Sequence, residues 1–144
     1  TMGSSLRIFL VDDDDSLRRL PLARYERLLR GEAGESLPHY AGRRVRYVLV
    51  SVDVVNRKPV EIVHVQHSLL AFDSKGRLDQ VDRKRKAKLA IDLLPALSGD
   101  EPEEVIDARH RFAKKRYDSE YSWEPTRKVR EAIMAAIFGE DSSG

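Results

Sequence analysis

Four consecutive aspartates at positions 12–15 are the residues in this sequence whose type and spacing most directly suggest chemistry. Clustered carboxylates suit Mg²⁺ or Ca²⁺, so Asp12 and Asp13 are candidate metal ligands and Asp53 is a candidate third. Mg²⁺ held there would suit a metal-dependent enzyme acting on phosphate esters. We favour the alternative that the aspartates cap a following helix and complement its dipole, because the run lacks the ligand spacing of a recognised metal-binding loop.

The segment that contains these aspartates, residues 8–20 (IFLVDDDDSLRRL), resembles the opening of a response-regulator receiver domain. In that family an acidic pair holds Mg²⁺ beside a phosphoacceptor aspartate, and Asp12 and Asp13 would match the pair. The family alternates strands and helices throughout, whereas here a hairpin follows Asp53. We therefore do not assign the chain to that family.

A second constellation lies on a predicted β-hairpin, whose strand-like runs at 43–55 and 60–72 flank a turn at 56–59. If Val55 lies opposite Val60, Ser51 faces His64, and Asp53 is their diagonal neighbour. These residue types could form a nucleophilic triad. No strained turn presents the serine and no glycine-rich loop offers an oxyanion hole, so we interpret them as part of a half-polar sheet face.

The same predicted face mixes apolar and polar side chains in the proportion typical of a homodimer interface. The opposite face, with valines at 48, 50, 52 and 54, is predicted to be the core side of the sheet. We therefore expect self-association through the hairpin, and the candidate interface residues are Tyr47, Leu49, Ile62 and His64.

Basic residues gather in the second half of the chain. Seven basic and two acidic residues occupy positions 75–88, and five lysines and arginines occupy 109–116. An apolar arc at 105, 108, 112, 113 and 117 is predicted on the second of these helical segments, with two arginines inside it. Neighbouring aromatic rings could stack on bases. The candidate anion- or nucleic-acid-binding residues are Arg83, Lys84, Arg85, Lys86, Arg109, Arg116, Tyr117 and Trp123.

Other interpretations of these basic residues remain open. An arginine within an apolar stripe can extend its charged end to solvent or pair with a buried acid. Trp123 stands next to a helix-breaking region and can fill the junction between two helices. Nucleic-acid binding is therefore an expectation without a recognised fold signature.

Helices and strands of an α+β protein must position these residues. The expected elements are a strand at 6–11, a helix that begins near Pro21 and ends at Gly31, the hairpin at about 43–72, and helices near 80–97, 102–120 and 125–138. The sequence predicts a small antiparallel sheet with three or four helices over one face. We expect one domain over 6–139, a cloning remnant at 1–5 and a frayed tail at 140–144.

Length and composition limit the remaining possibilities. The chain has 144 residues, 41% hydrophobic and 35% charged, with a net charge of +2. It contains no cysteine, which excludes disulfides, thiolate metal sites and cysteine nucleophiles. No apolar run approaches the ~20 residues of a membrane span, and we expect a cytoplasmic location. The best hypothesis is a non-enzymatic binding module without a cofactor, and a purely structural subunit is a further alternative.

Overall fold

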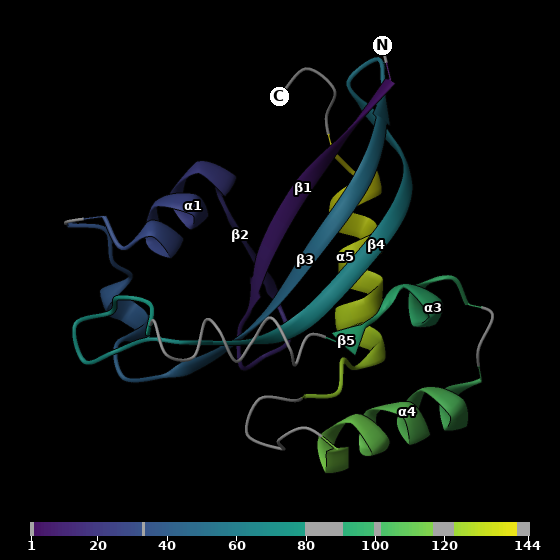
Figure 1. Ribbon diagram of the computed structural model, residues 1–144. Helices are drawn as coiled ribbons and strands as arrows, with labels where there is room; N and C mark the ends of the chain where they lie inside the picture. The colour runs from purple at the N-terminus through teal and green to yellow at the C-terminus, as the bar shows by residue number, and fades with distance from the viewer. Residues whose placement is uncertain (1, 33, 80–90, 100–101, 117–122, 141–144) are drawn as a thin grey trace.

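A five-stranded antiparallel sheet in the order β2-β1-β3-β4-β5 organises the protein (Figure 1). The computed structural model describes residues 2–32, 34–79, 91–99, 102–116 and 123–140. The strands are β1 (Met2–Val11), β2 (Leu17–Leu20), β3 (Arg44–Val55), β4 (Lys58–Ala71) and β5 (Ile91–Asp92). The helices are α1 (Leu22–Arg30), the 3-10 turn η1 (Pro38–Tyr40), α3 (Leu94–Leu97), α4 (Glu103–Arg116) and α5 (Arg127–Phe138). The predicted α+β class is confirmed.

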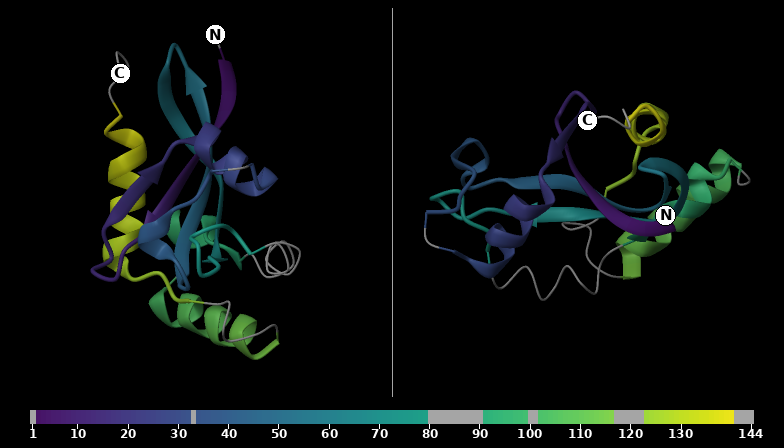
Figure 2. Two further views of the ribbon diagram at one scale, coloured as in Figure 1. Left: turned by 90° about the vertical axis from the view of Figure 1, so that its left-hand side faces the viewer. Right: turned by 90° about the horizontal axis from the view of Figure 1, so that it is seen from above.

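Both faces of the sheet are covered, and the expectation of helices on one face is wrong. Along β1, Phe9 and Val11 belong to one apolar cluster with α5, whereas Ile8 and Leu10 belong to a second cluster with α1. Successive side chains of a strand point to opposite faces, so a continuous apolar run is typical of a strand buried on both sides. The helices α1 and α5 accordingly lie on opposite sides of the sheet (Figure 2).

The β3–β4 hairpin closes through two residues, Asn56 and Arg57, both with positive φ, and not through the predicted four-residue loop. Val55 consequently pairs with Lys58. Two register shifts follow along β4, and each leaves one β4 residue without an opposite partner. Between Arg44 and Ser51 the register is the predicted one, so Ser51 does face His64.

Several segment boundaries differ from the prediction. Residues 17–20, for which the sequence predicted no element, form the edge strand β2. Residues 2–5, which were expected to lie outside the fold, pair with 52–55 of β3. Within the predicted helix at 80–97, residues 91–92 form β5 and only 94–97 are helical, while 80–90 lie outside the described residues. Backbone pairing in edge strands depends on the neighbouring strand, which a local pattern does not contain.

Helix α1 has the predicted ends. Pro21 immediately precedes it, and Gly31 ends it in the left-handed conformation at φ 68°. The Gly31 N–H donates to Leu28 O, which satisfies one of the free carbonyls at the helix end. This geometry positions the loop at 32–42, which forms part of the site described below.

Candidate anion-binding site

The four aspartates form a tight turn between β1 and β2. The Asp12 N–H donates to Ser16 O at 2.9 Å, and the Asp15 N–H donates to Asp12 O at 2.9 Å, with Asp15 at φ 66°. The Ser16 hydroxyl donates to Asp14 Oδ1 at 2.6 Å, and this hydrogen bond lowers the pKa of Asp14. The prediction that the run caps the next helix is wrong, because β2 stands between this turn and α1.

The acidic turn instead contacts the N-terminus of α5. Thr126 is the N-cap of α5 and accepts from the Val129 N–H, while its own hydroxyl donates to Asp15 Oδ2 at 3.0 Å. Lys128, in the first turn of α5, donates to Asp14 O at 2.7 Å. The turn therefore places negative charge at the positive end of the α5 dipole.

Arginines, and not neighbouring carboxylates, face the aspartate side chains. Asp15 pairs with Arg46 at 2.9 Å, Asp13 with Arg43 at 3.4 Å, and Asp12 with Arg18 at 3.8 Å. Among the described residues no three acidic or histidine side chains are placed to hold one metal ion.

Asp53 is remote from the acidic turn. It pairs with Ser4, whereas the end of β1 that leads into the turn pairs with Arg46. Seven residues of strand separate Arg46 from Asp53, which is about 23 Å at 3.3 Å per residue. Asp12, Asp13 and Asp53 therefore cannot share one Mg²⁺ ion.

Tyr40 anchors the arginine side of the turn. Its buried ring stacks on Phe72 with centroids 5.8 Å apart, and its hydroxyl donates to Asp12 Oδ1 at 3.3 Å. Burial, and then the Asp12 charge, raises the pKa of Tyr40. The Arg43 guanidinium lies 5.7 Å from the ring centroid and that of Arg18 lies 6.0 Å away. A ring face at these distances attracts and orients a guanidinium.

A hollow of about 480 Å³ opens beside Arg43. We call it the arginine hollow, and its lining residues are Gly42, Arg43, Arg44, Ala71, Phe72 and Asp79. Both arginines are exposed and adjacent in sequence, at the start of β3, while Ala71 and Phe72 come from the end of β4. Arg43 and Arg44 both line this hollow, and an exposed guanidinium group provides paired N–H donors that bind a phosphate or carboxylate group.

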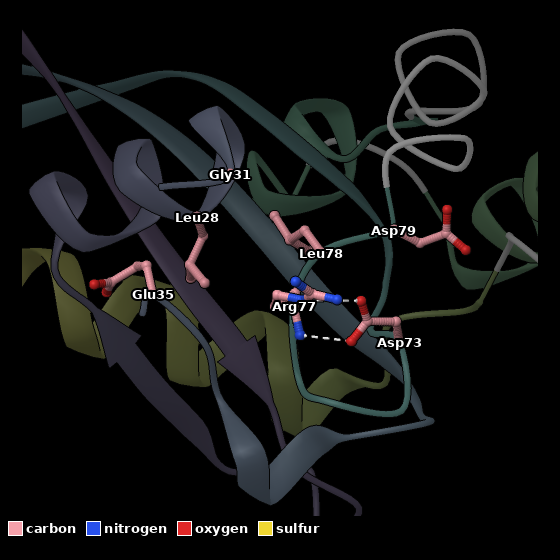
Figure 3. Close-up of a pocket in the computed structure, with 7 residues that line it drawn as sticks. All are labelled: Leu28, Gly31, Glu35, Asp73, Arg77, Leu78 and Asp79. Carbon is pink, nitrogen blue, oxygen red and sulfur yellow. Dashed lines mark hydrogen bonds and ion pairs between the residues drawn. The ribbon is translucent and has the colours of Figure 1, made fainter. Parts of the chain in front are cut away.

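A second hollow, of about 400 Å³, lies under the end of α1 (Figure 3). Leu28 and Leu78 supply its apolar part, and Asp79 also lines the arginine hollow. In Figure 3 the Arg77 side chain reaches Asp73, with Nε 3.3 Å from Asp73 Oδ2. The backbone N–H groups of Arg77 and Lys75 donate to Asp73 Oδ1 at 3.0 and 2.8 Å, respectively. The hydrogen bond from the Arg77 N–H is the main cause of the lowered pKa of Asp73.

Gly76 lies where the loop that contains Leu37 meets the turn at 73–79. Leu37 N–H donates to Gly76 O, and Gly42 N–H donates to Asp73 O, both at 2.8 Å. Gly76 has φ +78°, a backbone conformation that glycine adopts without strain. A Cβ there would stand 2.7 Å from Leu37 O, so the close approach requires glycine. The loop at 32–42 is thus tied to the turn at 73–79.

Most of the predicted anion-binding residues lie outside the described part of the chain. Arg83, Lys84, Arg85, Lys86 and Tyr117 lie outside the described residues, and Arg116 is described only as part of the α4 backbone. Arg109 is half-buried, and its Nε and one terminal nitrogen are shielded from solvent. It therefore presents less charge to a partner than the sequence predicted.

Trp123 is buried and does not present a ring for base stacking. Its Nε1–H donates to Ser68 O at 2.7 Å, and its ring meets His67 edge-on with centroids 5.2 Å apart. The Arg46 guanidinium lies 5.2 Å from the Trp123 ring centroid. Trp123 therefore packs against the sheet and fills space in the core. The alternative interpretation was right that Trp123 has a packing role, but it expected a junction between two helices and not the sheet.

The predicted hairpin interface is divided between the core and the surface. Tyr47 and Ile62 are buried, and neither presents its side chain to a partner. Ile62 was placed on the outer face, but the register shift between Ser51 and Val52 pairs it with Val52 and turns it into the core. Burial also raises the pKa of Tyr47. Leu49 and His64 remain partly exposed, and their role in an interface stays a prediction.

The Ser–His–Asp grouping differs from the expected one. His64 Nδ1 lies 3.8 Å from Asp92 Oδ1, and Asp92 comes from β5, a strand that was expected to lie within a helix. Asp53 instead stands on the far side of the register shift, opposite Glu61. The groups around His64 are half exposed, and such a setting weakens each electrostatic contribution that catalysis would need.

Arg43, Arg44 and Tyr40 are the residues of this site that sequence reasoning missed. The available signal was the pair of arginines directly after Gly42 in a segment rich in turn-forming residues. The stacking of Tyr40 on Phe72 was not visible, because these positions are far apart in sequence.

Comparison with known proteins identifies no relative of this chain. No protein-family model, no curated protein and no solved structure matches this chain. In the described part of the chain, no helix has the length and apolar character to cross a membrane. Function must therefore be inferred from the site itself.

Proposed function

We propose that this protein is a binding module for a phosphate-bearing partner, nucleic acid being the first to test, and that the partner docks at the arginine hollow. The observation that carries the proposal is the pair of exposed arginines lining one concave surface of about 480 Å³. Planar guanidinium groups bind phosphate oxygens through paired N–H donors, so two of them can hold adjacent phosphates.

Arg43 is partly ordered before any partner arrives. Tyr40 holds its guanidinium at 5.7 Å from the ring centroid. Fixing a side chain in advance lowers the entropic cost of binding. Its acidic neighbour Asp13 is 3.4 Å away with a side chain 93% exposed, and an ion pair so exposed contributes ~1 kcal/mol at most. A phosphate can therefore compete with Asp13 for Arg43.

The sequence contains more positive charge shortly after this surface. Asp79 lines the hollow, and Arg83 follows it by four residues in sequence. The predicted residues Arg83, Lys84, Arg85 and Lys86 lie outside the described part of the chain. Their nearness in sequence to Asp79 is the reason to consider them together with the arginine hollow.

A titration of fluorescently labelled single- and double-stranded oligonucleotides tests the proposal. Binding is measured by anisotropy at several salt concentrations for the full chain and for the double variant Arg43→Glu/Arg44→Glu. The control is Arg57→Glu/Lys58→Glu, which makes the same charge change on exposed residues of the hairpin turn. For double-stranded DNA, loss of two phosphate contacts should reduce the slope of log K against log salt by about 1.8.

Two results would overturn the proposed function. Absence of binding at low salt would leave no nucleic-acid partner, and would favour the structural subunit considered above. Equal loss of affinity in both double variants would mean diffuse attraction to a basic chain and no docking at the arginine hollow.

A further inference from the structure

Helix α4 presents an apolar face to solvent. It contacts the core through Ile106, which is 3% exposed and belongs to the cluster around α5. Figures 1 and 2 show α4 at the end of the molecule opposite the hairpin turn, with no described element on its outer side. The sequence predicted an apolar arc that contains 105, 108 and 112, and the structure exposes these three residues.

This outer face carries the most exposed large apolar side chain in the described part of the chain. Phe112 is 62% exposed and Val105 is 48% exposed, and Ala108 lies between them and is also exposed. Spacings of three and four residues put all three on one side of a helix. Single exposed apolar residues are ordinary, but three aligned on one helix face are typical of a contact surface.

The charges along α4 select the partner. Acidic residues occupy positions 103, 104 and 107, while five basic residues occupy 109–116. A second copy of the helix running antiparallel would set the acidic half of each against the basic half of the other, whereas a parallel copy would oppose like charges. The same distribution suits the dipole of α4 itself, but the dipole gives no reason for an exposed Phe112.

We propose that α4 is a self-association surface, on which a second copy of this chain docks its own α4 antiparallel, with Ala108 at the crossing point. The two helices are related by a twofold axis, so the same patch serves both copies. Arg111 of each copy then lies near Glu104 of the other, and Phe112 packs beside the Val105 turn of the other. This surface is separate from the arginine hollow, and the inference does not rest on the proposed function.

The small side chain of Ala108 permits this approach. Packed helices have axes about 8–10 Å apart and Cα atoms lie about 2.3 Å from each axis. The two Ala108 Cα atoms would therefore stand about 3.4–5.4 Å apart at the crossing, a range that overlaps the 4.4–6.8 Å of disulfide-linked residues. One helix pair is smaller than the ~800 Å² per partner of a standard interface, so we expect a reversible dimer.

Sedimentation velocity over a concentration series is the first measurement. Wild-type protein should dimerise with rising concentration, and Phe112→Asp should weaken the dimer at least tenfold. Phe138→Asp is the matched control, because Phe138 is 47% exposed but lies on α5. Since both phenylalanines are exposed, neither substitution removes core packing, and circular dichroism checks that each variant is folded.

A disulfide trap tests the orientation. The chain has no cysteine, so Ala108→Cys introduces the only thiol, and mild oxidation should link two copies. Ala135→Cys, at an exposed alanine of α5, is the control and should stay unlinked. Arg111→Glu should weaken the dimer, and Glu104→Arg/Arg111→Glu should restore it because the opposite charges are exchanged.

Each negative outcome overturns a stated part of the proposal. A protein that stays monomeric at every concentration has no self-association surface. A dimer that Phe112→Asp leaves intact uses another surface, such as the predicted residues Leu49 and His64. The third outcome is a dimer that Phe112→Asp dissociates, while Ala108→Cys forms no disulfide and the charge exchange does not restore association. Such a dimer uses α4 but not in the antiparallel arrangement. None of these readouts involves nucleic acid.

Discussion

Replacing Gly76 with alanine should destabilise the protein through two effects that a matched variant separates. Gly76 has φ +78°, and an added Cβ would stand 2.7 Å from Leu37 O, 2.8 Å from Leu37 C and 2.9 Å from Pro38 Cα. All three atoms belong to the backbone, so the contact cannot be relieved by a side-chain rotation. The backbone of the loop at 32–42 must move away from the turn at 73–79.

The magnitude follows from the separate contributions. A non-glycine residue in the left-handed region costs about 1–2 kcal/mol. Moving Leu37 away also breaks its 2.8 Å hydrogen bond to Gly76 O, and a typical hydrogen bond contributes about 0.5–1.5 kcal/mol. With the residual steric strain, Gly76→Ala should lower the free energy of unfolding by about 2–4 kcal/mol.

Gly99→Ala is the control, because Gly99 has φ +76° and a Cβ added there would meet no atom within 4 Å. It should lose only the backbone contribution, about 1–2 kcal/mol. In urea unfolding with a slope of about 2 kcal/mol/M, the midpoint should fall by about 1–2 M for Gly76→Ala and by about 0.5–1 M for Gly99→Ala. Equal midpoints for the two variants would refute the steric argument, and with it the requirement for glycine where Gly76 meets Leu37.

Three further predictions follow from individual contacts. Trp123→Phe removes the donor to Ser68 O, and urea unfolding followed by circular dichroism should show a loss of about 1–3 kcal/mol; an unchanged midpoint would contradict the importance of this bond. Thr126→Ala removes the N-cap of α5 and its bond to Asp15 and should destabilise the protein by about 0.5–2 kcal/mol, whereas Thr126→Ser, which keeps a hydroxyl, should lose less. The pKa of Asp73 is lowered, chiefly by the hydrogen bond from the Arg77 N–H. The charged form of Asp73 therefore stabilises the fold at pH values above its ordinary pKa, near 3.9. This stabilisation is lost as the pH falls through the lowered pKa of the folded state. The stability difference between wild type and Asp73→Asn should therefore be larger at neutral pH than in acid, and a difference independent of pH would exclude a contribution from the charge.

Local patterns were sufficient where one segment determines its own conformation. Gly31 ends α1 because the left-handed C-terminal position favours glycine, and this end was predicted from the sequence. The hairpin was visible from its two β-type runs, but its turn was not, since Asn56 and Arg57 adopt positive φ in a two-residue connection where a longer loop was expected. The error of two residues at the turn was absorbed by the two register shifts, and so Ser51 still faces His64.

Charged and aromatic residues were harder to place, because their partners come from elsewhere in the chain. The aspartates at 12–15 were seen as metal ligands or as a cap for the next helix, yet the contacts that Asp15 makes are to Arg46 and Thr126. Trp123 was a candidate for base stacking, but in the structure its ring is buried and its Nε1–H donates to Ser68 O. In each case the choice between function and packing depended on a residue distant in sequence.

The sequence by itself determined the α+β class, the ends of α1 and the absence of cysteine chemistry, since composition and local backbone preference are properties of contiguous residues. Only the tertiary structure decided which faces are buried and which charges meet. It covered both faces of the sheet, placed Asp12 beside Tyr40 and turned Phe112 toward solvent. The physical reason is that burial and ion pairing depend on distances between segments, and an amphipathic pattern specifies that a face exists without specifying what will cover it.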